Sequence, residues 1–161
     1  MTQTLPQVGH QHHAHILEMT NRFPEIADAL LVDHGRGATA ELQRVREFLQ
    51  GTLVPHLEAA EATIYPELER MLQNRHSMTP MRREHHELRR LISGYSGLVE
   101  QTRGETVSID RALALRRLLF GMYALLKVHL AEEEEYLRIV EHGVSEDAAA
   151  ILAAALEHPV K

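Results

Sequence analysis

The sequence contains no cysteine and no tryptophan, and aromatic residues make up only 4% of its 161 positions. Without cysteine there is no disulfide, no thiolate metal site and no cysteine nucleophile. Valine, isoleucine and threonine are sparse beside leucine, alanine, glutamate and arginine, and this composition favours helix over strand. The length suits one domain that is large enough to bury a hydrophobic core.

The sequence also lacks an excess of positive charge, and its formal net charge is -6. The sequence therefore lacks the basic surface of a nucleic-acid-binding protein. No apolar run approaches the ~20 residues that a membrane-spanning helix needs. The segment 1–11 lacks the basic start and apolar stretch of a secretory signal. We expect no nucleic-acid partner, no membrane insertion and a cytoplasmic location.

Apolar residues recur at helical spacing over four long segments and predict an all-α fold. The short loops between these helices indicate an antiparallel up-down four-helix bundle with a short extra C-terminal helix. The whole chain, 1–161, is expected to form one domain with its core in 10–142. The expected helices cover about 7–32, 38–73, 80–100, 109–142 and 145–157.

Prolines predict kinks in these helices, and capping residues predict where the helices begin. Pro24 should kink the first helix, and Pro55 and Pro66 should kink or split the second. Thr79, followed by a proline, and Ser108 are the expected N-caps of the third and fourth helices. The Gly-Arg-Gly segment at 35–37 predicts the first turn.

Histidine is in clear excess, with 12 of 161 positions. An internal repeat aligns His13 with His85 and, further along, His56 with His129. His56 follows His13 by 43 residues, His129 follows His85 by 44, and both midpoints fall in predicted turns. Residues equidistant from the turn of an antiparallel hairpin lie at the same height. The four histidines are therefore expected in one layer of the bundle core.

Carboxylates accompany two of these histidines. Glu133 lies one turn after His129 in the apolar stripe of its helix, where a charged glutamate is costly unless it is paired or bound to metal. Its acidic neighbours at 132, 134 and 135 are expected on a solvated face. On the second helix, Ala60 stands four residues after His56, and Glu61 stands five after it. Imidazole and carboxylate without thiolate suit iron, manganese, zinc, nickel or copper.

These residues resemble the hemerythrin-like, or HHE cation-binding, family across about 10–140. That family carries a histidine on its first helix, His-xxx-Glu on the second, a histidine on the third and a second His-xxx-Glu on the fourth. Its members hold a carboxylate-bridged di-iron centre. The resemblance is carried by His56 with Glu61-Ala62-Thr63-Ile64-Tyr65-Pro66, by Met81-Arg82-Arg83-Glu84-His85, and by His129-Leu130-Ala131-Glu132-Glu133-Glu134.

The resemblance implies a metal site drawn from His13, His15, His56, Glu61, His85, His129 and Glu133. His12 and His15 are alternatives to His13 on the first helix. Ala60 stands where the family has the glutamate of its second helix. Glu58, Glu61 or Tyr65 could replace that ligand, or the position could stay open, and a single metal is then an alternative to two.

By this resemblance, we expect a non-haem, di-iron protein that binds, senses or reacts with dioxygen, peroxide or nitric oxide. Weak peroxidase, catalase or ferroxidase activity would be its enzymatic form, and zinc or manganese is the alternative metal. A sensing role would require a protein partner. The competing hypotheses are a store or buffer for divalent metal and a helical interaction module with a degenerate site. The Glu-x-x-His pairs of ferritin-like bundles and the His-Glu-x-x-His pattern of zinc peptidases are absent.

Overall fold

A computed structural model of the chain describes residues 5–32, 35–102 and 106–143, and these ranges consist of helices joined by turns, with no strand. The prediction of an all-α helical bundle is confirmed, whereas the helix expected over 145–157 lies outside the described residues. No helix in the described ranges is long and apolar enough to cross a membrane. The α-helices are α1 (Leu5–Asn21), α2 (Phe23–Ala29), α3 (Ala38–Phe48), α4 (Val54–Ala59), α5 (Tyr65–Met71), α6 (Thr79–Glu100) and α7 (Ile109–Gly143).

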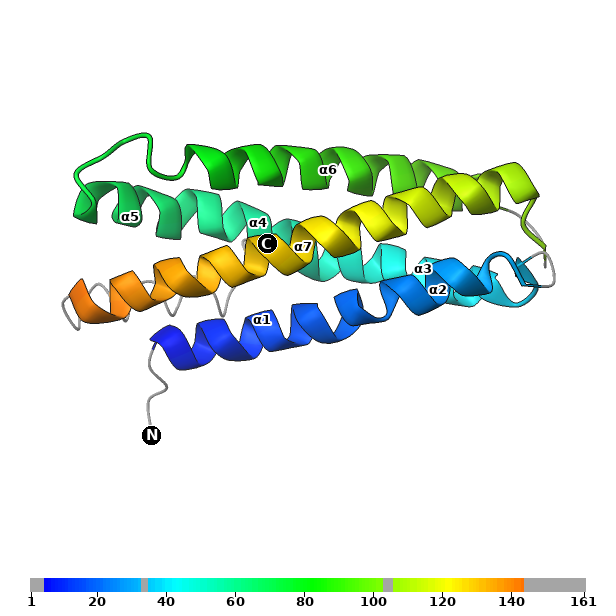
Figure 1. The fold of residues 1–161 in the computed structure, drawn as a ribbon, viewed down its shortest axis with the longest axis horizontal. Coiled ribbons are helices and arrows are strands. Elements are labelled where there is room, and N and C mark those ends of the chain that lie inside the picture. The colour runs from blue at the N-terminus through cyan, green and yellow to red at the C-terminus, as the bar shows by residue number, and fades with distance from the viewer. Residues whose placement is uncertain (1–4, 33–34, 103–105, 144–161) are drawn as a thin grey trace.

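The helices lie side by side along the long axis of the molecule (Figure 1). α7 packs against α1, α2 and α6, and α3 packs against α6. Their apolar stripes form two separate groups of buried side chains. The larger group includes Leu57, Leu88 and Leu130, and the smaller one includes Met81 and Leu137. Along α4, α6 and α7, the histidine-bearing turns fall between these two apolar clusters.

Each helix interruption lies beside a proline. α1 ends at Asn21, and α2 begins at Phe23 with Pro24 in its first turn, which confirms the predicted kink. The second helical stretch continues through two π-helical turns, Leu49–Leu53 and Ala60–Ile64, directly before Val54-Pro55 and Tyr65-Pro66. Proline lacks an N–H, and its ring crowds the carbonyl four residues earlier, so a wider turn relieves that clash. The predicted interruptions are confirmed, and they take the form of wide turns.

The turns and caps agree with the sequence except at one boundary. Gly35 and Gly37 have φ of 65° and 76°, in the region that favours glycine, which confirms the first turn. The hydroxyl of Ser108 accepts the N–H of Arg111 at 3.4 Å, as expected of an N-cap. The prediction for Thr79 was wrong by one position, because α6 begins at Thr79 and its N-cap is the preceding residue, with no side-chain cap.

Tyr95 ties α6 to α3, because its buried hydroxyl donates to the backbone carbonyl of Leu42 at 3.1 Å. We expect Tyr95→Phe to lower the free energy of unfolding by about 1 kcal/mol, the usual net value of such a hydrogen bond. Urea denaturation followed by circular dichroism would measure this. The half-buried Tyr123→Phe is the control; an equal loss in both variants would contradict the assignment.

Candidate metal centre

Five polar side chains are buried together in the layer between the two apolar clusters. They are contributed by α1, α4, α6 and α7, and they are His13, His56, His85, His129 and Glu133. The rings of His13 and His56 have centroids 5.3 Å apart, and those of His85 and His129 lie 4.7 Å apart. The structure thus brings together the four histidines that their spacing placed at one height.

Glu133 lies at the centre of this layer. Its Oε2 atom is 3.0 Å from His56 Nε2, 3.2 Å from His13 Nε2 and 3.8 Å from His129 Nε2. Two groups of three ligand atoms result, each within 4.8 Å: His13 with His56 and Glu133, and His85 with His129 and Glu133. The same carboxylate, Glu133, belongs to both groups.

A second ring of carboxylates orients three of the imidazoles. The Nδ1–H of His85 donates to Glu61 at 2.8 Å, and that of His129 donates to Glu84 at 2.9 Å. His13 Nδ1 likewise meets Glu134 at 2.7 Å. An ionised carboxylate only accepts hydrogen bonds, so it holds the proton on Nδ1 and leaves Nε2 facing the centre. Metal-binding histidines commonly have such partners.

The pair His85 and His129 has the geometry of two ligands to one ion. With both protons held on Nδ1, their unprotonated Nε2 atoms face each other at 3.1 Å. Two facing lone pairs repel each other unless a cation lies between or beside them. Metal–nitrogen bonds of about 2.0–2.1 Å place neighbouring ligands of one ion about 3 Å apart. The donor set and its spacing therefore fit a divalent metal.

Hydrogen bonding and burial set the charges in the layer. Burial opposes ionisation of Glu133, but the charge of His56 and the hydrogen bonds from His13 and His56 outweigh it and hold the pKa of Glu133 well below its usual range. Burial likewise lowers the pKa of His13, but Glu133 and Glu134 together raise it. Burial, reinforced by His129, lowers the pKa of His85 to about 4. The raised pKa of His13 and the lowered pKa of Glu133 favour an ion pair between these two groups, whereas burial favours the neutral form of His85.

Tyr65 lies on the helical stretch where Ala60 stands instead of the expected glutamate, and it brings a hydroxyl oxygen into the layer. It is fully buried, and its hydroxyl donates to Glu133 Oε1 at 2.9 Å and lies 2.9 Å from His85 Nε2. Burial first, and then the charge of Glu133, raise the pKa of Tyr65. Glu58 is exposed. Glu61 turns away from the centre toward His85 Nδ1 and the Arg89 guanidinium, which donates to it at 2.8 Å.

Of the three candidate histidines on α1, only His13 faces Glu133. His12 is half-buried, with its ring 5.0 Å from that of His56. His15 is exposed and belongs to neither ligand group of the described residues. Helical rotation explains this, because a residue two positions from an inward-facing one points away from the core.

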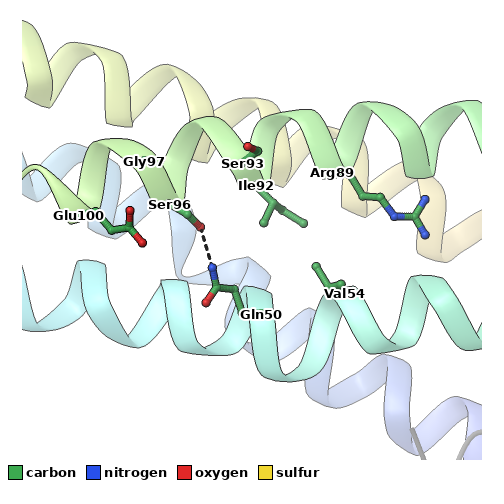
Figure 2. Close-up of a pocket in the computed structure, with 8 residues that line it drawn as sticks. All are labelled: Gln50, Val54, Arg89, Ile92, Ser93, Ser96, Gly97 and Glu100. Atoms are coloured by element: carbon green, nitrogen blue, oxygen red, sulfur yellow. Dashed lines mark hydrogen bonds between the residues drawn. The ribbon is translucent and has the colours of Figure 1, made fainter. Parts of the chain in front are cut away.

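A small cavity of about 10 Å³ borders the layer, with room for about one water molecule. Besides His12, His13, Tyr65 and Glu133, it is lined by the largely apolar set Ile64, Leu68, Tyr136 and Leu137. A larger groove of about 520 Å³ lies between α6 and the Gln50–Val54 segment (Figure 2). Gln50 donates to Ser96 across it, and Arg89 at its edge reaches Glu61. The buried donor atoms, however, adjoin the small cavity.

Two carboxylates of this site, Glu84 and Glu134, were not predicted from the sequence. Glu134 was expected on a solvated face, but it accepts a hydrogen bond from His13, and its side chain is 23% exposed. Glu84 precedes His85 by one residue and meets His129 of the facing helix. Both contacts join residues far apart in the sequence, so no local spacing marks them. The sequence marks them only as acidic residues next to predicted ligands, since Glu84 precedes His85 and Glu134 follows Glu133.

The family model described as the hemerythrin HHE cation binding domain matches residues 7–140. This match spans most of α1, all of α2 to α6 and most of α7, and it includes every residue of the buried layer. Comparison with curated proteins and comparison with solved structures each gave no significant match.

Proposed function

Because the chain belongs to the family of hemerythrin HHE cation-binding domains, we propose that its buried layer binds two iron ions and takes up a small molecule such as dioxygen, peroxide or nitric oxide. The observation that carries this proposal is the convergence of buried imidazole nitrogens on one carboxylate, Glu133. The up-down antiparallel order of the helices belongs to the same proposal.

The proposed ligands follow from the two groups that share Glu133. His13 and His56 would hold one ion, and His85 and His129 the other. Tyr65 would add an oxygen donor at the second position, since its hydroxyl lies near His85 Nε2 and Glu133. Glu61 supports His85 from outside, and we assign neither Glu61 nor the exposed His15 as a ligand.

The surroundings favour a small reactant. Bound ferrous iron supplies electrons and open coordination positions for a diatomic molecule or peroxide. The cavity beside His13 and Glu133 has room for about one water molecule, and the side chains of Ile64, Leu68 and Leu137 keep it largely apolar. The high pKa of Tyr65 keeps a proton on its hydroxyl beside Glu133.

Anaerobic loading with ferrous iron tests this function. We expect two irons per chain by metal analysis, one for each ligand group, and new visible absorption when air or peroxide is added. His129→Ala should lose iron, whereas His15→Ala should keep it, because His15 is exposed. Failure of the unaltered chain to bind iron, or full iron content in His129→Ala, would refute the proposal. Iron binding without a spectral response would favour a metal store or buffer.

A further inference from the structure

The two metal positions have unequal support from the surrounding protein. We propose, resting on the function above, that His85, His129 and Glu133 form a tight position and that His13, His56 and Glu133 form a weaker, exchangeable one. The chain would then keep one ion firmly and release or exchange the other.

The outer hydrogen bonds give the first reason. Both imidazoles of the His85–His129 position have a carboxylate on Nδ1, namely Glu61 and Glu84. Glu61 is itself held by Arg89. Such outer partners fix the ring and its tautomer, and losing one typically weakens metal binding by about 10–100-fold.

His56 lacks this support. Its Nδ1 atom is buried and has no hydrogen-bond partner among the described residues, although the side chain is fully enclosed. Its Nε2–H donates to Glu133 at 3.0 Å. To offer the Nε2 lone pair to an ion, His56 must carry its ring proton on Nδ1, where no described residue accepts it. A buried donor without an acceptor costs free energy, and only this position carries that cost.

The packing of the helices and the place of the small cavity also indicate that the His13–His56 position is the weaker one. His85 and His129 lie on α6 and α7, which pack against each other, and Tyr65 adds an oxygen beside His85. His13 lies on α1 and His56 on α4, and these two helices are not among the closely packed pairs of the described residues. The small cavity is lined by His13 and its neighbour His12 but by neither His85 nor His129, so the weaker position is the one that borders this space.

Titration of the metal-free chain with Co²⁺ tests the inequality, because this ion stays divalent in air and its visible absorption reports its ligands. We expect two binding steps whose apparent dissociation constants differ by about tenfold or more, and one Co²⁺ per chain after dialysis against a weak chelator. His56→Ala should remove the weaker step and keep the retained ion.

Substitutions of the outer carboxylates test each metal position by itself, because they change the support of one position without removing a ligand. Glu84→Gln should weaken the tight step and bring the two constants together, whereas Glu134→Gln should weaken only the second step. Two equal steps, or loss of the retained ion in His56→Ala and Glu134→Gln, would overturn the inequality while leaving the metal-binding function intact. No Co²⁺ and no Fe²⁺ bound by the unaltered chain would overturn both.

Discussion

Replacing Glu133 with glutamine should abolish metal binding at both of the proposed positions. Glu133 is the one carboxylate shared by the two ligand groups, and its amide replacement keeps the shape while removing the negative charge. Its NH2 group would also point donors at histidine nitrogens that must act as ligands. Because loss of an outer partner alone costs about 10–100-fold in affinity, we expect a larger loss here, visible as near-zero metal after desalting.

The matched control is Glu135→Gln, which changes the same side chain two positions later on the exposed surface of α7. That variant should keep the metal content of the unaltered chain. If Glu133→Gln kept one ion at unchanged affinity, the carboxylate would serve a single position, and the shared-ligand arrangement would be wrong. Circular dichroism would verify that both variants remain helical.

The metal-free protein should lose stability as the pH falls from 7 toward 4. The pKa of His85 is about 4 in the folded chain because of burial, against an ordinary value of 6.5. Between these values the unfolded chain binds the additional proton, so the stability present above pH 6.5 is lost as the pH falls. At about 1.4 kcal/mol per pH unit, His85 alone accounts for about 3 kcal/mol.

Other groups in the layer modify this trend. Burial lowers the pKa of His129, which adds to the loss in acid. His13 works in the opposite direction, because its raised pKa contributes stability that is present in acid and is lost as the pH rises through the folded value. We expect the lowered values to dominate, since burial is the largest cause at both His85 and His129 and outweighs the carboxylates beside them.

Thermal unfolding of the metal-free chain at a series of pH values would measure this. A loss of about 3 kcal/mol corresponds to about 6–12 °C for a chain of this size. The variant His85→Gln has no titrating ring and should show a flatter profile, whereas the exposed His76→Gln should match the unaltered chain. A melting temperature constant from pH 7 to 4.5 would contradict the burial of neutral imidazoles.

The histidine layer was predictable because it depends on distances along regular helices. Counting outward from the two turns put His13 level with His56 and His85 level with His129, and the irregular turns between them did not alter this pairing. The position of Glu133 followed from its place one turn after His129. The apolar stripes likewise predicted the four helical stretches.

The second helix was harder to predict because its geometry departs from the regular α-helix. The rule that a ligand lies four residues after His56 leads to Ala60, which is the first residue of a π-helical turn. Neither the wide turn nor the contact of Glu61 with His85 follows from local spacing. The placement of Tyr65 at the centre depends on that turn together with packing against α6 and α7.

The polar layer divides the apolar interior into unequal parts, and the smaller part, which contains Tyr65, Leu68, Met81 and Leu137, lies beyond it. Four imidazoles and a carboxylate hold the helices across this boundary less firmly than leucine would when no metal links them. We expect backbone amides of α5 and the start of α6 to exchange with deuterated water sooner than those around Leu119. Metal binding should slow that exchange, because an ion bound by residues of several helices would link those helices and reduce local opening at this end of the bundle.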